Sequence, residues 1–202
     1  MKDLIVISYD DSKLGKYFEK CRNDLETYLE SIGLNPNIHC LHNACNKTSI
    51  DQIVNTLSDN YCVIVYAHGS NVAVEDQHGN TLVHEDDVSH FHNSIFYSTA
   101  CYNAESLGST LIRYMSKIFF GYKDYSWALD NDDGIVFIET DNFALKKILS
   151  GCKNGQKIYE ETYEFFYQKY KELESSNFAL APLMYHNMDT MRVYEYPNKE
   201  YF

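Results

Sequence analysis

Short apolar runs alternate with amphipathic helical patterns along most of this 202-residue chain. Runs such as those at residues 4–9 and 61–67 have the length and composition of strands that are buried on both faces of a sheet. Between the runs, apolar residues recur every three or four positions, as in helices that pack one face on a core. The alternation predicts an α/β fold in which a mainly parallel sheet is sandwiched between helices.

The sequence also predicts where the elements lie. We expect strands at residues 4–9, 37–42, 61–67, 94–100, 117–122 and 191–196, and helices at 14–32, 104–116, 135–149 and 156–173. Ser49 and Gln52 have the spacing of a capping box that starts one more helix. Two apolar segments, 72–75 and 81–84, flank a polar turn and predict a small hairpin. With three prolines, no flexible linker and no repeat, the sequence predicts one domain over residues 1–202.

Composition excludes several classes of partner and place. The formal charge is −12 and the lysines and arginines form no stripe, which argues against nucleic acid and anionic membranes as partners. The first apolar run is too short for a signal peptide, and no run reaches the roughly 18 apolar residues of a membrane span. The six cysteines form no C-x-x-C pair. We therefore expect a cytoplasmic protein with free thiols.

Two residues with catalytic potential follow neighbouring predicted strands. His68 comes just after the run at 61–67, and Cys101 comes just after the run at 94–100. In α/β sheets, functional groups collect beyond the carboxyl ends of the strands. A thiol with an ordinary pKa of about 8.5 needs a base, and an imidazole can take its proton and later protonate a leaving amine. The backbone N–H groups of Gly69 and Cys101 are the expected oxyanion-hole donors.

Three segments of the chain resemble, in the same order, motifs of the caspase-like cysteine peptidases. They are Tyr-Ala-His-Gly at 66–69, Ser-Thr-Ala-Cys at 98–101, and Gly-Tyr-Lys-Asp-Tyr-Ser-Trp at 121–127, the last followed by Asp-Gly-Ile-Val-Phe-Ile at 133–138. This fold is shared by caspases, gingipains and CHAT peptidases, and the minimal layout is most similar to that of bacterial members such as CHAT.

The resemblance implies a mechanism and partners. It implies a cysteine endopeptidase with a Cys-His dyad, His68 and Cys101, that needs no metal and no organic cofactor. Ser126 and Trp127 would line the cleft, and the Ser126 backbone would pair with an extended peptide as an added strand. The implied partners are a protein or peptide substrate and a regulatory or activating protein. By analogy alone, relatives of this kind suggest regulated cell death or antiviral defence in bacteria.

The residue before the scissile bond, P1, is predicted from the contacts that this chain lacks. Caspases hold a P1 aspartate with cationic and amide side chains, but the matching positions here are Thr99, Ala128 and Asp10. An aspartate bound there would be desolvated and unpaired. Carboxylates cluster instead on the loops expected to border the cleft: Asp10 and Asp11 after the first run, and Asp124, Asp130, Asp132 and Asp133 around Ser126-Trp127. Asp130 and Asp132 are the first choices for a pocket floor, so the sequence predicts cleavage after Arg or Lys. A small or apolar P1 residue is the alternative.

The sequence also allows two other interpretations, a metal site and a function without catalysis. Two groups contain metal-ligand residue types: His39, Cys40, His42 and Cys45, and His84, His90 and His92. The first group matches no regular zinc module, and the second surrounds an acidic run expected to be a solvated loop or a short helix start, so no metal site is expected. The rival function is a catalytically inactive caspase-fold module that binds other proteins. Such a module has no need to retain both members of the dyad.

Overall fold

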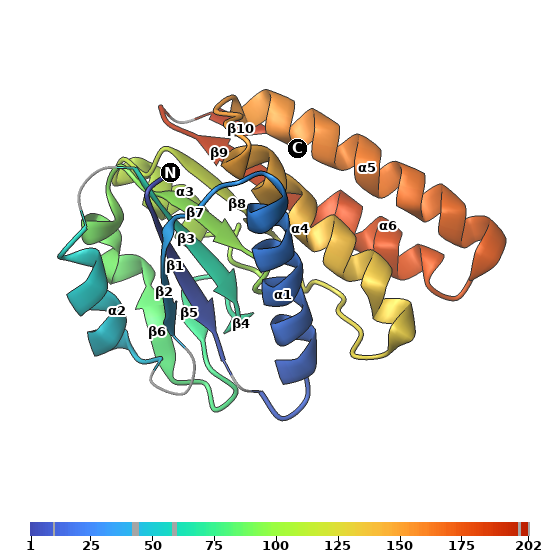
Figure 1. Cartoon of the computed structure of the whole chain (residues 1–202), viewed down its shortest axis with the longest axis horizontal. Helices are drawn as coiled ribbons and strands as arrows, with labels where there is room; N and C mark the ends of the chain where they lie inside the picture. The colour runs from blue at the N-terminus through green and yellow to red at the C-terminus, as the bar shows by residue number, and fades with distance from the viewer. Residues whose placement is uncertain (10, 42–44, 58–59, 198, 202) are drawn as a thin grey trace.

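A seven-stranded sheet lies at the centre of the described part of the chain, with the strand order β10-β9-β8-β7-β3-β1-β2 (Figure 1). The computed structural model describes residues 1–9, 11–41, 45–57, 60–197 and 199–201. The strands are β1 (Asp3–Ser8), β2 (Asn37–Leu41), β3 (Tyr61–Tyr66), β7 (Ile95–Ser98), β8 (Ile118–Tyr122), β9 (Met191–Glu195) and β10 (Lys199–Tyr201).

The sheet is parallel from β2 to β8, and β9 and β10 extend it in antiparallel pairing. Every residue of β3, β7 and β8 is buried. Parallel strands with helices on both faces have no solvated side, which is why these segments read as continuous apolar runs. The predicted mainly parallel sheet is therefore confirmed. Its last predicted strand, β9, joins the sheet beside β8, and β10, which was not predicted, forms the edge.

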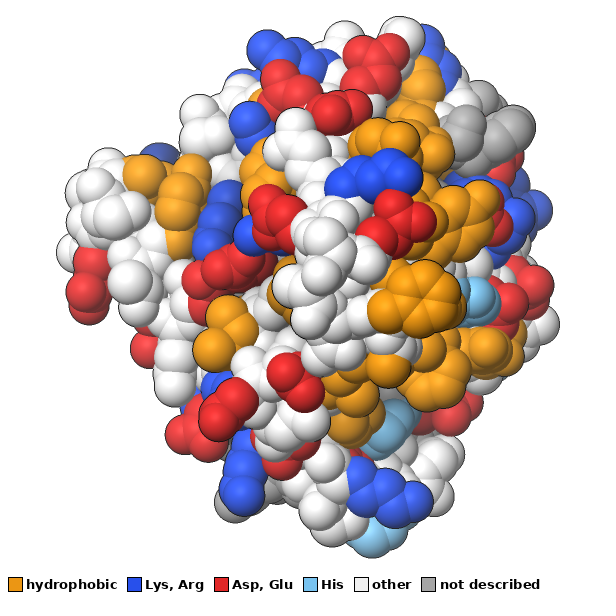
Figure 2. Space-filling model, turned by 90° about the vertical axis from the view of Figure 1, so that its right-hand side faces the viewer, with side chains coloured by type: hydrophobic (Ala, Val, Ile, Leu, Met, Phe, Trp, Pro, Cys, Tyr) orange, Lys and Arg blue, Asp and Glu red, His pale blue; other side chains and the backbone are white. Residues whose placement is uncertain are grey.

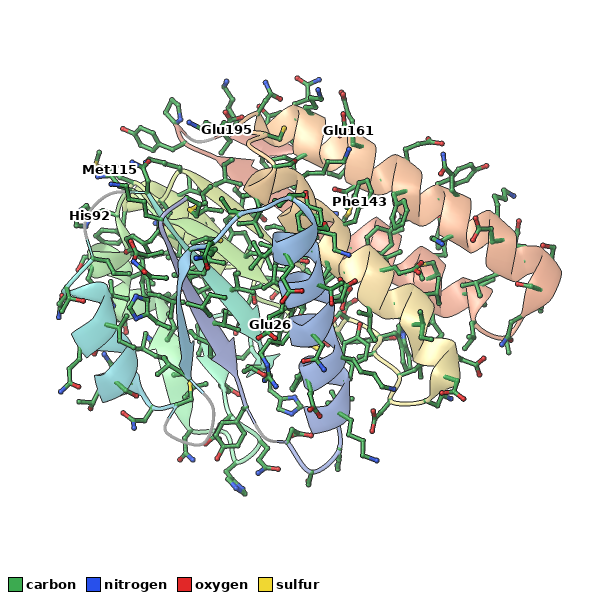
Figure 3. The ribbon with its side chains drawn as sticks, viewed as in Figure 1. Glu26, His92, Met115, Phe143, Glu161 and Glu195 are labelled. Atoms are coloured by element: carbon green, nitrogen blue, oxygen red, sulfur yellow. The ribbon has the colours of Figure 1, made fainter. Side chains whose placement is uncertain are left out.

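Helices cover the two faces unequally. One face packs on α1 (Gly15–Ser31), α4 (Ile135–Leu149), α5 (Gly155–Ser176) and α6 (Ala181–Thr190), and the other packs on α2 (Lys47–Val54) and α3 (Leu107–Arg113). On the larger side the side chain of Phe143 on α4 lies toward α5 (Figure 3), where it stacks on Phe165 with ring centroids 4.1 Å apart. None of the helices in the described ranges has the length and hydropathy of a membrane span.

A small three-stranded sheet follows β3. It consists of β4 (His68–Gly69), β5 (Ala73–Glu75) and β6 (Thr81–His84), paired antiparallel in that order. The predicted hairpin is confirmed, and its turn is held by the Asp76 carboxylate, which accepts hydrogen bonds from the N–H groups of His78 and Asn80, both at 2.8 Å. A 3₁₀ helix, η1 (Glu85–Phe91), follows and accounts for the acidic run near the second histidine group.

Several elements differ from the predictions. Helix α3 is shorter than the predicted helix at 104–116, and β10 was not predicted. The capping box of α2 is formed by Asn46 and Ser49 and not by Ser49 and Gln52, because α2 already begins at Lys47 and Ser49 occupies its third position. The Asn46 side chain accepts the Ser49 N–H at 3.0 Å, and Ser49 Oγ accepts the Asn46 N–H at 3.2 Å. The sequence also gave no indication of α6, which packs against α5.

The surface charge fits the composition. On the face shown in Figure 2, lysine and arginine side chains are scattered among acidic ones, and hydrophobic side chains form a band between them.

Candidate active site

The structure brings the two predicted catalytic residues to the same side of the sheet, beyond the carboxyl ends of its parallel strands. β3 and β7 are parallel neighbours, so the segments that leave them emerge side by side. The His68-Gly69 and Ala100-Cys101 segments then touch: a Cβ atom built at Gly69 would lie 2.8 Å from Ala100 Cβ and 2.9 Å from the Cys101 carbonyl oxygen. A side chain at position 69 would push the two segments apart. Glycine is therefore required by the close approach of the backbones.

Cys101 is half-buried and its thiol contacts the predicted substrate segment. The Ser126 N–H donates to Cys101 Sγ at 3.4 Å, and Ser126 Oγ donates to the Thr99 carbonyl at 2.8 Å. Tyr102 follows with a φ of 61°, a left-handed conformation that is uncommon for a non-glycine residue and forms the sharp turn after the thiol. Its N–H donates to the Asp124 carbonyl at 3.0 Å, which ties the turn to the same segment.

Asn103 joins this turn to the loop that follows β4. Its side chain is fully buried and accepts a hydrogen bond from Ser98 Oγ at 2.8 Å. Its Nδ2 donates to the carbonyls of Ser70 and Ala73, each at 2.8 Å. One amide thus fixes the Cys101 turn relative to the loop beside His68, a contribution that the sequence analysis missed.

His68 is oriented by a carboxylate. Its Nε2 lies 2.8 Å from Asp11 Oδ2, and the ring meets Phe18 edge-on with centroids 6.0 Å apart. Because Nε2 donates to Asp11, the neutral ring carries its lone pair on Nδ1. The His68 side chain is 37% exposed, so this nitrogen is within reach of solvent and substrate. Among the described residues, no hydrogen bond links His68 directly to Cys101.

Hydrogen bonds stabilise the ionised form of the Asp11 carboxyl. Its side chain is only 3% exposed, and its other oxygen accepts the N–H groups of Lys13, at 2.6 Å, and of Leu14. Burial raises the pKa of the Asp11 carboxyl, but the hydrogen bonds from Leu14, His68 and Lys13 outweigh burial and leave the pKa below its ordinary value. In the sequence Asp11 counted only as one of several loop carboxylates. An aspartate that accepts N–H groups two and three residues ahead is a recognisable local turn, but its partner His68 is 57 residues away.

Neither of the two expected oxyanion-hole donors has a hydrogen-bond partner among the described residues. The Ser70 N–H donates to the Ala73 carbonyl at 2.9 Å, which makes these residues a hydrogen-bonded pair. Opposed residues of antiparallel strands alternate between bonded and non-bonded pairs, so the next pair, Gly69 and Val74, is non-bonded and the Gly69 N–H points away from β5. The Cys101 N–H likewise has no hydrogen-bond partner in the part of the chain that the structure describes.

The segment at 125–127 is held from α6. Trp127 N–H donates to Asn187 Oδ1 at 2.7 Å, and Asn187 Nδ2 donates back to the Trp127 carbonyl at 2.9 Å. His186 Nε2 donates to the Tyr125 carbonyl at 2.9 Å. The Trp127 side chain itself stays 37% exposed and meets the Tyr125 ring edge-on. Of the predicted cleft residues, Ser126 and Thr99 lie beside Cys101, and Trp127 is next along the chain.

The predicted pocket carboxylates are placed less clearly. Asp130 Oδ1 is buried without a hydrogen-bond partner, and the nearest cation is Lys20 Nζ at 4.0 Å. Asp132 is exposed at the start of a short 3₁₀ helix, η2 (Asp132–Gly134). Within the described ranges, no hydrogen bond or ion pair joins either carboxylate to Cys101. Asp10 lies outside the described residues.

The described residues include no group of three or more His, Cys, Asp or Glu side chains that could hold a metal ion. His39 pairs with Asp3 at 3.5 Å, and His90 lies 3.2 Å from Asp51. His42 and the Cys40 side chain lie outside the described part.

The sheet order, the helices on both faces and the small antiparallel sheet after the histidine strand define a caspase-like fold. No protein-family model matches the chain, and no curated protein matches it. Among solved structures, the Arg-specific cysteine proteinase gingipain R (RgpB) has a TM-score of 0.64 at 12% identity over 97% of this chain and 46% of that one.

Two further structures are similar in part. The complex of the Porphyromonas gingivalis RgpB pro- and mature domains gives a TM-score of 0.62 at 12% identity, over 96% of this chain and 47% of that one. An inactive zymogen of a C11 protease from Parabacteroides distasonis gives 0.48 at 18% identity, over 64% of this chain and 49% of that one. The chain thus spans less than half the length of the gingipain chains it resembles, and at this identity the likeness concerns the fold.

Proposed function

We propose that this protein is a cysteine endopeptidase in which Cys101 is the nucleophile, His68 the general base and acid, and Asp11 the residue that orients the imidazole. The observation that carries the proposal is the position of His68. Its Nε2 is bound at 2.8 Å by a buried carboxylate, while its strand end packs directly on the Cys101 turn. A nucleophile, a base and a group that orients the base form the arrangement that activates a thiol.

The proposed reaction uses only these groups. Substrate binding places the scissile carbonyl beside Cys101, His68 Nδ1 takes the thiol proton, and Sγ forms a bond to the carbonyl carbon. The oxyanion of the tetrahedral intermediate accepts the Gly69 and Cys101 N–H groups. The carbon–nitrogen bond then breaks as the imidazolium returns its proton to the leaving amine. Water, deprotonated by His68, hydrolyses the thioester and regenerates the thiol.

Asp11 favours this cycle electrostatically. The carboxylate stabilises the imidazolium that forms when the thiol is deprotonated, and it keeps Nδ1 available as the basic nitrogen. The hydrogen bonds from Lys13 and Leu14 keep Asp11 ionised at the pH where the imidazole works.

For the substrate, we propose an extended peptide that lies along residues 126–128 with Arg or Lys at P1. Support for the basic residue comes from Asp130, whose buried Oδ1 has no hydrogen-bond partner among the described residues and could accept a guanidinium or ammonium. The gingipain neighbour is described as Arg-specific. A regulatory partner, a cytoplasmic location and a setting in bacterial cell death or antiviral defence stay predictions by analogy.

The first experiment tests the nucleophile. Wild type and Cys101→Ala are compared by proteome-wide cleavage profiling, with Cys152→Ala as the matched control because Cys152 is the other half-buried thiol among the described cysteines. We expect cleavage and labelling by a peptide electrophile to disappear in Cys101→Ala and to persist in Cys152→Ala. His68→Ala should be inactive as well, because nucleophile and base act as one unit. Near-wild-type turnover by Cys101→Ala would exclude the mechanism. A wild type that cleaves nothing would favour the inactive binding module.

The second experiment tests the P1 residue with fluorogenic peptides that differ only there. Arg and Lys peptides should be cleaved best, and Asp130→Asn should lower their turnover about ten- to a hundredfold, the value of a charge-assisted contact. Asp132→Asn is the matched control, since that carboxylate is exposed. Equal or better cleavage of the Leu or Asp peptide would contradict basic specificity and leave the dyad unaffected.

A further inference from the structure

The segment that follows β8 runs beside α6 with alternating contacts. Its odd-numbered residues bond to the helix: Lys123 N–H donates to the Thr190 carbonyl at 2.9 Å, and the Tyr125 carbonyl accepts from His186. Trp127 follows with both of its backbone groups on one helix residue. Contacts at every second residue are also those of an extended strand. Residues 123–127 are not a β-strand, since Lys123 and Asp124 form bends, but they contact the helix in the alternating way in which a strand contacts its neighbour.

The even-numbered residues of the same segment face the other way, toward the Cys101 turn. The Asp124 carbonyl accepts the Tyr102 N–H at 3.0 Å, and the Ser126 N–H donates to Cys101 Sγ at 3.4 Å. The Ser126 carbonyl and the Ala128 N–H have no hydrogen-bond partner in the described part of the chain. These unpaired groups are on the side where a peptide would have to lie.

Asn187 is chemically suited to hold such a segment. In an extended residue the N–H and the C=O point the same way, and a neighbouring strand satisfies both with one acceptor and one donor. The side-chain amide of asparagine offers the same pair. Asn187 Oδ1 accepts the Trp127 N–H at 2.7 Å and its Nδ2 donates to the Trp127 carbonyl at 2.9 Å, while the residue has no exposed surface. The helix thereby substitutes for an edge strand.

We propose that Asn187 is a positioning residue for substrate binding: it holds residues 126–128 beside Cys101, where an extended peptide can pair with them. His186 holds the same segment two residues earlier, with its ring stacked on Tyr125 at 4.4 Å and 18°. This inference rests on the proposed peptidase function. We call the pair of hydrogen bonds between Asn187 and Trp127 the clamp. Its loss should weaken the binding of extended peptides and leave the thiol chemistry in place.

The chain provides a direct probe of the clamp. Trp127 is its single tryptophan, so tryptophan fluorescence reports on the clamped residue alone. In Asn187→Ala, we expect stronger acrylamide quenching and lower anisotropy, because the freed segment gains mobility. The kcat/KM for an extended peptide should fall about tenfold, mainly through KM. A substrate with P1 alone should lose less, and alkylation of Cys101 by iodoacetamide should keep its rate.

The matched control is Asn142→Ala. Asn142 is equally buried, and its amide bonds to Tyr66 Oη, the Cys21 carbonyl and Asp24, away from residues 123–127. It should lower stability with no change in Trp127 quenching or in KM. If Asn187→Ala does not fold, His186→Phe serves instead, since it keeps the stacked ring and removes one hydrogen bond; a smaller shift in the same direction is expected.

The outcomes separate the two proposals. The comparison is made at equal folded fraction. The clamp would be overturned if the Asn187 or His186 variant had the same Trp127 quenching and the same KM as Asn142→Ala. Increased quenching with an unchanged KM for the extended peptide would also overturn it, since the segment would then not be where peptides bind. If the wild type cleaves no peptide, the peptidase proposal fails, and the clamp is then tested by the binding of a peptide electrophile at Cys101. Equal affinities of the wild type and Asn187→Ala would overturn the clamp. A tenfold weaker affinity of the variant would support it.

Discussion

Asp141 is a buried acid whose ionisation should oppose folding. It lies on α4 with 1% exposure, and its two oxygens accept the hydroxyl groups of Tyr17 and Tyr122, both at 2.7 Å. None of the ion pairs among the described residues includes it. Burial raises the pKa of the Asp141 carboxyl from 3.8 to about 6, although the two tyrosine hydroxyls pull it down.

The sign and size of the effect follow from linkage. A carboxyl whose pKa is higher in the folded state binds more protons there, so stability is retained below the unfolded pKa and is lost as the pH rises through the folded pKa. The change from 3.8 to about 6 corresponds to about 3 kcal/mol by pH 8. Roughly half of this loss develops between pH 5 and pH 8, because the rest has already occurred at lower pH.

Asp141→Asn removes this titration and keeps an amide that can still bond to both hydroxyls. Urea unfolding of the two proteins, followed by far-UV circular dichroism from pH 5 to pH 8, gives the difference in free energy of unfolding at each pH. The difference should move by about 1–2 kcal/mol in favour of the variant as the pH rises. Groups shared by both proteins cancel.

Asp76→Asn is the control for this measurement. Burial raises the pKa of the Asp76 carboxyl, but the hydrogen bonds from Asn80 and His78 outweigh burial and lower the pKa below its ordinary value. Asp76 therefore titrates below pH 5, and its difference curve should be flat across the range. Parallel profiles of the wild type and Asp141→Asn would refute the assignment of a raised pKa to Asp141.

Three further predictions concern the site. Asp11→Asn should lower kcat/KM about a hundredfold or more, because His68 loses the charge that orients it, and an unchanged pH–rate profile would contradict that role. Gly69→Ala should destabilise the fold by about 1–3 kcal/mol and abolish peptide cleavage. The added Cβ would lie 2.6 Å from Asn103 Nδ2 and 2.9 Å from the Cys101 carbonyl oxygen. Gly33→Ala, with a φ of +64° and nothing within 4 Å, should cost about 1 kcal/mol and keep full activity; equal losses in the two would argue against the close approach. Activity should require a reducing agent and be indifferent to chelators, and zinc-dependent recovery after chelation would contradict a metal-free dyad.

The sequence predicts elements well where burial decides them. The runs that became β3, β7 and β8 are apolar throughout because both faces of the sheet are covered, and helix α4 begins and ends where its periodicity does. Helix α6 escaped prediction because its ten residues include His186, Asn187 and Asp189, which interrupt the apolar pattern, and because its packing against α5 is not visible in the sequence.

The site shows the same division. Neighbouring strand ends bring His68 and Cys101 together by a general rule of parallel sheets. The residues that hold the site, Asp11, Asn103 and Asn187, act through side-chain hydrogen bonds on partners that are 57, 33 and 60 positions away, respectively. No periodicity encodes such pairings. Only the tertiary structure shows them.

The strand order has a consequence for how the molecule opens. His68 and Cys101 follow β3 and β7, which lie inside the sheet with further strands on either side, whereas β2 and β10 form its edges. Local fluctuations begin at edges and chain ends, and the interior of a sheet exchanges its amide hydrogens last. Breathing of the outer strands therefore leaves the thiol and the imidazole in place. The protection of β3 and β7 amides should approach that of global unfolding, and the chemistry should persist up to the melting transition.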